Sequence, residues 1–322
     1  MSILSGKNIL LGISGGIAAY KSIFLLRLFI KKGANVQVIM TPSAKDFVTP
    51  LTLSTLSNRP VLSEFFDKKN KNAVWNNHVD LGLWADLFII APATSNTLSK
   101  MASARADNLL LATYLSSKCP VYFAPAMDLD MHKNLANQEN IKKLKDFGKK
   151  HIPVNSGFLA SGLEGEGRMS EPQEIIDFIS QDIKKELKLY NKNVMITAGP
   201  TYESIDAVRF IGNFSSGKMG FALAKTASKL GANVTLITGP SSENLIDDNI
   251  KIINVVTADQ MFAEVKKHFS FSDISIMSAA VSDYKPKNTI NTKIKKENQN
   301  ILSIELVENI DILKYLGLNK SK

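Results

Sequence analysis

The stretch that decides the fold lies near the N-terminus and reads Asn8-Ile9-Leu10-Leu11-Gly12-Ile13-Ser14-Gly15-Gly16-Ile17-Ala18-Ala19-Tyr20-Lys21. Its first six residues form an apolar run typical of a buried strand, and an amphipathic helix is expected to follow the glycines. Glycines between a strand and a helix let backbone N–H groups approach an anion, which the helix dipole also attracts. The spacing matches neither a P-loop nor the G-x-G-x-x-G fingerprint, so a tight turn without a ligand stays open as the alternative.

The same alternation of apolar runs and longer amphipathic runs continues along the chain, which is typical of parallel α/β sheets. In the first half we expect strands at 8–13, 35–40, 87–91 and 121–124, and helices at 17–32, 94–102, 107–117 and 133–147. In the second half we expect strands at 194–197, 233–238, 251–255 and 274–278, and helices at 218–230 and 258–268. A helix over 172–189 separates the two series. The pattern predicts an α/β protein with two doubly wound, Rossmann-like parallel-sheet domains, 1–189 and 190–322.

Length and composition agree with this division. At about 150 residues per domain, the 322 residues suggest two domains, and 44% hydrophobic residues exclude a disordered chain. The single cysteine, Cys119, excludes an internal disulfide framework and fits a reducing compartment. The apolar segments are too short and too charged to span a bilayer, and no secretory segment is evident. We therefore expect a cytoplasmic protein with no membrane partner.

The net charge of +9 comes from 39 Lys+Arg against 30 Asp+Glu. Most of the lysines lie in mixed-charge, helix-like segments, and no zinc finger, RRM or aromatic-basic pattern accompanies them. The charge favours anionic partners without saying which, and we expect no nucleic acid among them.

Polar residues follow two of the expected strands. Thr94-Ser95-Asn96-Thr97 stands at the carboxyl end of one strand, which is the ligand side of an open α/β sheet; helix capping is the alternative. Ala124-Pro125-Ala126-Met127-Asp128-Leu129-Asp130-Met131 follows the next strand. Its two carboxylates lack a histidine pair or a third acid, so a metal site is not favoured there.

Two further segments of the first half suggest chemistry. His78 precedes a core strand, and a histidine can transfer protons near neutral pH, although capping or packing is the more ordinary role. Residues 155–169 contain four glycines within eleven residues, which is typical of a mobile flap. A flexible linker is the alternative, but Phe158, Leu159 and Leu163 indicate that the segment packs on something.

The second half carries two candidate phosphate sites. Asn213-Phe214-Ser215-Ser216-Gly217-Lys218-Met219-Gly220 precedes a helix, as a phosphate-binding turn would, although its spacing departs from Walker A. A basic loop follows later in the chain, and a solvated charged loop is its alternative reading. Its lysines are Lys285, Lys287, Lys293, Lys295 and Lys296.

Taken together, these segments resemble the family that combines phosphopantothenoylcysteine decarboxylase with phosphopantothenate–cysteine ligase in coenzyme A biosynthesis. Residues 12–21, 91–94 and 125–128 resemble its flavin-dependent decarboxylase domain. Residues 209–220, 279–284 and 293–296 resemble its CTP-dependent ligase domain. The resemblance implies a flavodoxin-like flavoprotein domain first, FMN, Mg²⁺ with CTP, and a homo-oligomer built on decarboxylase trimers with the flavin between subunits.

The resemblance also implies roles for residues of the first domain. His78, Asp128 and Ser161 would be catalytic. FMN would be held by Ser14, Gly15, Gly16, Ile17, Ser43, Thr94, Ser95, Asn96, Thr97 and Ala126, and the substrate by Met131, Arg168 and Met169. In the family's chemistry, flavin oxidises the cysteinyl thiol to a thioaldehyde. Carbon dioxide then leaves, because the carbanion delocalises onto C=S, and reduced flavin returns the electrons.

For the second domain, the resemblance implies ligation of 4′-phosphopantothenate to cysteine through an acyl-cytidylate. Asn213 and Lys293 would be catalytic, and Mg²⁺ would be bound largely through the polyphosphate, with protein ligands unknown. Substrate and nucleotide would be bound by Arg209, Ser278, Ala279, Asp283, Asn309, Ile310, Asp311 and Ile312. The family pattern continues beyond residues 308–313, so we expect an incomplete ligase domain.

Two positions depart from the family pattern. Asp128 stands where the family has Asn, and a substrate carboxylate about 4 Å away would be repelled by an ionised Asp by ~1–4 kcal/mol. Ser161 stands where the flap carries a proton-donating cysteine, and a hydroxyl is a much weaker acid than a thiol. Two alternatives follow: a flavin-binding regulatory module without turnover, or another flavin-linked enzyme such as a peptidyl-cysteine decarboxylase or a flavin prenyltransferase. The ligase-type second half argues against the other flavin-linked enzymes.

Overall fold

The structure, a computed structural model, describes residues 2–66, 75–295 and 302–320. The chain divides into two compact units, Met1–Ile183 and Lys184–Lys322, and each is described by itself. The sequence predicts the boundary at residue 189. Helix α8 (Pro172–Lys185) ends earlier than expected, and Ile175, Ile176 and Ile179 on its apolar face pack into the core of the first unit.

The first unit is built on a five-stranded parallel sheet of order β2-β1-β3-β4-β5. Its strands are β1 (Asn8–Ile13), β2 (Asn35–Met40), β3 (Leu87–Ala93), β4 (Val121–Pro125) and β5 (Lys150–His151). The central strands read as continuous apolar runs because helices cover both faces of the sheet. The order 2-1-3-4-5 is the flavodoxin-like one, which confirms the predicted fold class of this unit.

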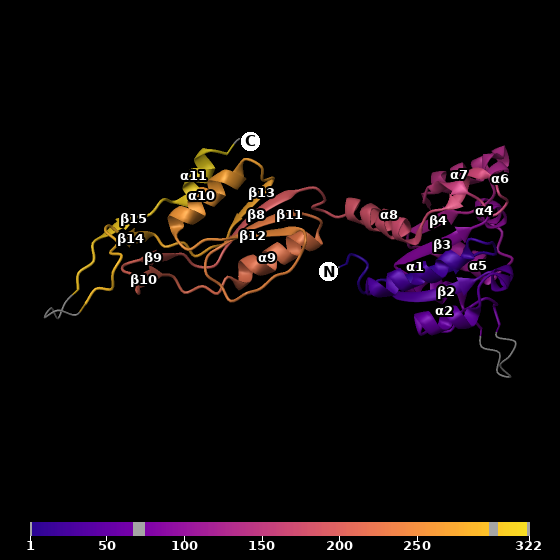
Figure 1. Cartoon of the computed structure of the whole chain (residues 1–322), viewed down its shortest axis with the longest axis horizontal. Helices are drawn as coiled ribbons and strands as arrows, with labels where there is room; N and C mark the ends of the chain where they lie inside the picture. Colours follow the sequence, from indigo (N-terminus) through magenta and orange to yellow (C-terminus); the bar gives the residue numbers. More distant parts are fainter. Residues whose placement is uncertain (1, 67–74, 296–301, 321–322) are drawn as a thin grey trace. The chain divides into compact units, whose positions relative to one another are not determined.

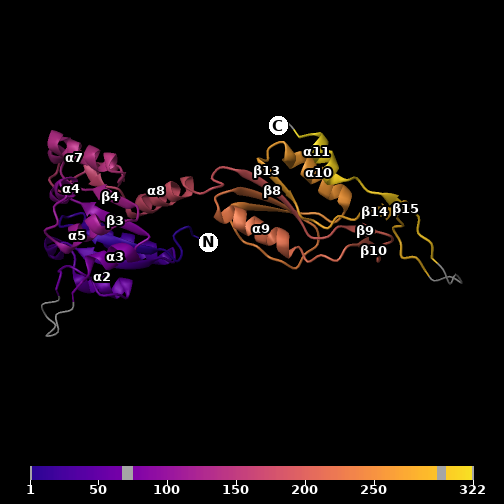
Figure 2. The same cartoon turned by 180° about the vertical axis from the view of Figure 1, so that it is seen from behind.

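Helices cover the two faces of this sheet and enclose two apolar cores (Figures 1 and 2). Helices α1 (Ala19–Lys31), α2 (Pro50–Ser57) and α8 contribute to one core. Helices α4 (Ser95–Ala102), α5 (Leu109–Ser116) and α7 (Leu135–Asp146) contribute to the other. The remaining helical segments are η1 (Pro42–Asp46), α3 (His78–Trp84) and α6 (Leu129–Lys133).

An antiparallel hairpin follows β5 and corresponds to the predicted flap. It consists of β6 (Val154–Phe158) and β7 (Glu164–Met169), with a register shift between Asn155 and Ser156. Met127 donates its N–H to the carbonyl of Gly167 over 3.1 Å, so the base of β7 lies against the turn that follows β4.

The second unit has a four-stranded parallel sheet of order β12-β11-β8-β13. Its strands are β8 (Asn193–Ala198), β11 (Asn233–Thr238), β12 (Ile250–Asn254) and β13 (Ile274–Met277). Helix α9 (Lys218–Lys229) packs on one face, and α10 (Ala258–Phe269) and α11 (Ile312–Leu318) pack on the other. This doubly wound arrangement confirms the predicted Rossmann-like class. Two small hairpins complete the unit: β9 (Tyr202–Ser204) with β10 (Phe210–Gly212), and β14 (Tyr284–Pro286) with β15 (Leu306–Glu308).

The expected strands and helices are present within two residues at either end, except that α8 ends at Lys185 and not at residue 189. The helix predicted over 133–147 is α7, which starts at Leu135 because the side chain of Asn134 accepts the N–H of Ala136. The helix predicted from residue 17 begins at Ala19, and the one predicted over 107–117 is α5. No helix within the described ranges is long and apolar enough to cross a membrane.

Candidate active site

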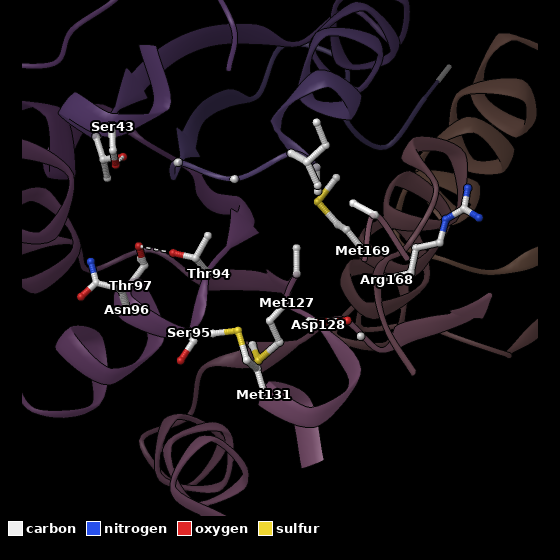
Figure 3. Close-up of a pocket in the computed structure, with 18 of the residues that line it drawn as sticks. Ser43, Thr94, Ser95, Asn96, Thr97, Met127, Asp128, Met131, Arg168 and Met169 are labelled. Atoms are coloured by element: carbon white, nitrogen blue, oxygen red, sulfur yellow. Dashed lines mark hydrogen bonds between the residues drawn. The ribbon is translucent and has the colours of Figure 1, made fainter. Parts of the chain in front are cut away.

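A cavity of ≈ 920 Å³ lies at the carboxyl edge of the first sheet (Figure 3). The turns after β1, β2, β3 and β4 contribute to its wall, and the flap supplies the rest. Because strand order reverses between β1 and β3, this edge is where ligands bind in open α/β sheets. The predicted residues that line it are Gly15, Gly16, Ile17, Ser43, Thr94, Ser95, Asn96, Thr97, Ala126, Asp128, Met131, Ser161, Arg168 and Met169.

Two helix N-termini open on this cavity with unused amides. In the described part of the chain, no hydrogen bond uses the N–H groups of Gly15 to Ala18 before α1, or those of Ser95 to Thr97 at the start of α4. The hydroxyl of Thr94 donates to that of Thr97 over 3.2 Å, the dashed line in Figure 3. Free amides at two helix N-termini attract a negative charge such as a phosphate.

The glycines permit a close approach between the turns. A Cβ atom added to Gly15 would lie 2.5 Å from Oγ and 2.8 Å from the carbonyl carbon of Ser43, and one added to Gly16 would lie 3.2 Å from Cγ2 of Thr94. The polar cradle made by these turns fits the phosphate and ribityl chain of a flavin mononucleotide, and the remaining apolar wall suits its ring.

Ser14 was predicted to bind the cofactor, but it does not line the cavity. It is buried, donates its hydroxyl to the carbonyl of Pro92 over 2.7 Å, and accepts the N–H of Thr94 over 3.0 Å. Ser14 therefore joins the turn after β1 to the turn after β3, behind the cavity wall.

Asp128 and Ser161, the two positions that depart from the family pattern, contact each other. The hydroxyl of Ser161, in the turn of the flap, donates to Oδ1 of Asp128 over 2.8 Å. The same oxygen accepts the N–H of Leu129 over 2.9 Å, where Asp128 caps helix α6. Both side chains line the cavity, so they present one polar pair to a bound molecule.

Lys21 is a cavity residue to which the sequence motifs assign no role. Its side chain is only 4% exposed, and Nζ donates to the carbonyl of Met169 over 2.7 Å and to Glu171 over 2.9 Å. Arg168 also pairs with Glu171, over 3.0 Å. The hydrogen bond from Lys21, opposed by partial desolvation and aided by both cationic charges, lowers the pKa of Glu171. This ion cluster, Lys21 with Arg168 and Glu171, holds the base of the flap against α1.

Other lining residues were missed because no pattern marks them. Lys100 and Asp107 form a salt bridge across the link between α4 and α5, and Asn108 caps α5 through the N–H of Leu111. Phe158, at the end of β6, is largely exposed beside the cavity. The sequence indicates that Phe158 packs on another part of the protein, but no pattern in it specifies this cavity.

His78 does not line this cavity. It begins α3 after the cap Asn77, and its ring meets that of Phe65 edge-on at 6.2 Å. Its Nδ1 is buried and has no hydrogen-bond partner among the residues that the structure describes. A single copy of the chain therefore does not bring His78 together with Asp128 and Ser161.

The residues predicted for the second unit gather on loops around its sheet. Asn213 donates to the carbonyl of Val281 over 3.0 Å, and Asn309 donates through Nδ2 to that of Ser282 over 2.7 Å. Ser278 bonds the carbonyl of Thr197, whose hydroxyl accepts the N–H of Ala279. These contacts join loops far apart in the sequence at the carboxyl ends of β8 and β13.

The other predicted residues of this unit have less contact with one another. Asp283 accepts the N–H of Asn309 through its carbonyl over 2.7 Å, and Asp311 caps α11, which begins at Ile312. Ile310 and Lys293 are exposed, and Lys296 lies outside the described residues. Among the residues that the structure describes, no group of three or more His, Cys, Asp or Glu side chains could hold a metal ion.

Comparison with known proteins extends this description. Residues 2–184 match the family described as "Flavoprotein", and residues 189–322 match the "DNA/pantothenate metabolism flavoprotein C-terminal domain". The flavodoxin-like sheet and its anion-attracting cavity thus define a protein of the flavoprotein class.

The chain belongs to the family of bifunctional coenzyme A biosynthesis proteins, which confirms the resemblance. It is 44% identical over 316 residues to the coenzyme A biosynthesis bifunctional protein CoaBC of Borreliella burgdorferi, covering 98% of this chain and 80% of that relative.

Two other similar proteins are decarboxylases. A cysteine/cysteine sulfinic acid decarboxylase of an unknown prokaryotic organism is 49% identical over 279 residues, covering 85% of this chain and 77% of that relative. Among solved structures, a cysteine-to-serine variant of PPC decarboxylase complexed with pantothenoylaminoethenethiol has a TM-score of 0.50 and 31% identity. The match covers 56% of this chain and 99% of that structure.

Proposed function

We propose that this chain performs two steps of coenzyme A biosynthesis. The second unit joins 4′-phosphopantothenate to cysteine at the expense of CTP, and the first unit decarboxylates the product, phosphopantothenoylcysteine, to 4′-phosphopantetheine. The observation that carries this proposal is the cavity at the switch point, where two helix N-termini offer free amides to a phosphate within a unit that matches the flavoprotein family. The similarity to CoaBC supports the ligation step.

FMN is the proposed cofactor of the first unit. Its phosphate would accept from the free amides before α1 and at the start of α4, with Ser43 and Thr97 beside them. When bound, the flavin supplies the two-electron oxidation and reduction of the substrate's cysteinyl carbon. The cavity volume of ≈ 920 Å³ lies near the upper end of the usual 300–1,000 Å³ for small-molecule sites, which leaves room for the substrate beside the cofactor.

The chain's own residues then bind the substrate and move the proton. Arg168 and Met169, held by the ion cluster at the base of the flap, lie against the substrate arm. Ser161 and Asp128 face the carbon that loses carbon dioxide. A proton from solvent would reach that carbon through the hydroxyl of Ser161, which Asp128 holds in place by accepting its hydrogen bond over 2.8 Å.

In the second unit, Lys293 and Arg209 would stabilise the charge of the nucleotide phosphates, and Mg²⁺ would enter with CTP. Asn213, held by the carbonyl of Val281, would bind the acyl group. Ser278, Ala279, Asp283 and residues 309–312 would contact the nucleotide and the substrate.

We also propose that the working form is a cytoplasmic homo-oligomer, built on trimers of the first unit. Ile17, in the turn before α1, and Phe24, on α1, are 63% and 58% exposed. Ile17 lines the cavity, so an apolar surface adjoins the site. A second copy that covers this surface would also explain how a histidine outside the cavity, His78, takes part in the reaction.

The test uses the purified full chain. A flavin absorption band, followed by release of carbon dioxide and phosphopantetheine on addition of phosphopantothenate, cysteine and CTP, is the expected result. If the protein binds flavin but forms neither carbon dioxide nor phosphopantetheine from these substrates, it would instead be a flavin-binding regulatory module. A sample without any flavin band, even after incubation with FMN, would overturn the proposal.

A second candidate is favoured by the 49% identity to a cysteine/cysteine sulfinic acid decarboxylase. Under this alternative the first unit acts on free cysteine or its sulfinic acid. Comparing kcat/KM for phosphopantothenoylcysteine, cysteine and cysteine sulfinic acid separates the two. We expect the phosphopantothenoyl substrate to be preferred, because the cavity extends well beyond the volume of a single amino acid.

A further inference from the structure

Asp206 is a buried carboxylate in the second unit for which neither the motifs nor the comparisons give a role. It lies in the turn between β9 and β10, and only 4% of its surface is exposed. Oδ1 accepts the N–H groups of Val208 and Arg209, each over 2.7 Å. Oδ2 accepts the N–H of Ile294 over 3.2 Å and pairs with the guanidinium of Arg209. Four donors occupy the acceptor sites of the carboxylate.

These hydrogen bonds join two segments 88 residues apart in the sequence. The basic loop meets the hairpin at further points: Ile290 donates its N–H to the carbonyl of Ile205 over 3.2 Å, and Arg209 also reaches the carbonyl of Ile294 over 3.5 Å. Lys293 immediately precedes Ile294. The carboxylate of Asp206 therefore determines where the backbone beside Lys293 lies relative to Arg209.

The carboxylate is ionised at neutral pH. Burial of Asp206 by itself would raise the pKa of its carboxyl group. This effect is outweighed by hydrogen bonds from three backbone N–H groups, those of Val208, Arg209 and Ile294, and by the charge of Arg209, so that the pKa is lowered to about 2. The side chains of Arg209 and Lys293 are both positively charged. The negative charge of Asp206 lies between their two segments and reduces the repulsion between them.

We propose that Asp206 is a positioning residue of the ligase site. It does not touch substrate; it holds Arg209 and the Lys293 segment in one arrangement, so that both positive charges meet the phosphates of the nucleotide without prior reordering of the loop. This inference rests on the proposed ligation. A preorganised pair of cations stabilises charge in the transition state, whereas a free loop must first be ordered at an entropic cost.

The test compares Asp206→Asn with Asp273→Asn in the full chain. Asn has nearly the same size as Asp, but one carboxylate oxygen is replaced by an NH₂ group. This NH₂ group would face another hydrogen-bond donor, either the N–H of Ile294 or the guanidinium of Arg209. Asp273 is a matched control in the same unit: it accepts the N–H of Asn193 over 2.7 Å and pairs with Lys192, but it lies at the amino end of the sheet. CTP-dependent pyrophosphate release, with phosphopantothenate as the acid, is the activity measured.

For Asp206→Asn we expect kcat/KM for CTP to fall on the order of 100-fold. Trypsin should cut faster after Lys293 and Lys295, while FMN content and decarboxylation of phosphopantothenoylcysteine stay unchanged. Asp273→Asn should stay within about 2-fold of wild type in both readouts, as expected for a surface ion pair. In a chain that already carries Lys293→Ala, Asp206→Asn should lower kcat/KM for CTP much less than it does alone. The reason is that both substitutions remove the positioned charge of Lys293 beside Arg209.

The outcomes separate the two claims. A wild-type chain that releases no pyrophosphate overturns the proposed ligation, and the positioning role with it. An active wild type with an unchanged Asp206→Asn variant, or strictly additive effects of Asp206→Asn and Lys293→Ala, overturns the positioning role alone. If Asp206→Asn melts at a markedly lower temperature, Ile294→Pro tests the same contact, because proline lacks the N–H donor and also restrains the backbone of residues 293 and 294. Normal activity and normal trypsin resistance in Ile294→Pro would also overturn the positioning role.

Discussion

The hydroxyl of Ser161 donates a 2.8 Å hydrogen bond to Oδ1 of Asp128, although the two residues are 33 positions apart. One comes from the turn of the flap and the other from the turn after β4, and both line the cavity. The resemblance to the decarboxylase family implies cysteine and asparagine at these positions. The two departures are therefore one structural unit, in which a weak acid is paired with a carboxyl group.

The first prediction concerns Ser161. Ser161→Ala removes the hydroxyl that relays the proton, and we expect phosphopantetheine formation to fall by ~10²–10⁴-fold, the usual contribution of general acid catalysis, while the flavin band is retained. Ser161→Cys introduces a stronger acid and should raise the rate. Product analysis by mass spectrometry measures both, with the half-buried Ser54→Ala in α2, which does not line the cavity, as control. Full activity of Ser161→Ala would remove Ser161 from the reaction.

The second prediction concerns Asp128. Asp128→Asn keeps an oxygen that can accept from Ser161 and the N–H of Leu129, so we expect FMN to stay bound and the fold to be preserved. Turnover should change, because a neutral amide replaces the carboxyl group that accepts the hydroxyl of Ser161 beside the reacting carbon. Steady-state decarboxylation kinetics check this, and identical kcat and KM values in the variant would refute a catalytic role.

A third prediction tests the cradle at Gly15. The added Cβ of Gly15→Ala would stand 2.8 Å from the backbone carbon of Ser43, so one of the two turns must shift. We expect a loss of FMN, measured as flavin absorbance per protein chain. Gly16→Ala, with its nearest contact at 3.2 Å, should lose less, and Gly317→Ala, which has no neighbour within 4 Å, should lose none. Equal flavin content in all three variants would contradict the proposed cofactor site.

The fourth prediction concerns the ion cluster at the base of the flap. Lys21→Met leaves the carbonyl of Met169 without its buried donor, and we expect a loss of about 1–3 kcal/mol in the free energy of unfolding of the first unit. The KM for phosphopantothenoylcysteine should also rise, because Arg168 and Met169 lose their anchor. Urea unfolding and steady-state kinetics measure the two effects. The exposed Arg27→Met on the same helix is the control, and a Lys21→Met variant no less stable than this control would exclude the anchoring role.

The fifth prediction is a pH dependence of stability that comes from His151. Burial, with the charges of Lys145 and His132, lowers the pKa of His151 to about 4, against about 6.5 in an unfolded chain. Between these values the unfolded state binds a proton that the folded state does not, so stability falls as the pH drops from about 6.5 to about 4. Thermal melting over this range should show the loss, and His151→Gln should reduce it. An equally steep pH dependence in the variant would assign the effect to other groups.

The alternating apolar runs were sufficient to predict both parallel sheets, because strands that are buried on both faces must be apolar throughout. Helix ends were predicted within two residues, apart from the end of α8. The break at Asn134 depends on a side chain that bonds a backbone N–H, which apolar periodicity does not report. The small hairpins were missed, since β9, β10, β14 and β15 are too short to carry an alternation pattern.

The sequence by itself determined the fold class, the family and the turns that line the cavity, because strand ends and glycine turns are local features. Only the tertiary structure decided which distant residues meet. It joined Ser161 to Asp128, buried Lys21 against the base of the flap, set Ser14 behind the cavity wall and left His78 outside it. It also brought Asp206 to the backbone of Ile294. Such contacts depend on how loops pack in three dimensions, and no spacing along the chain specifies them.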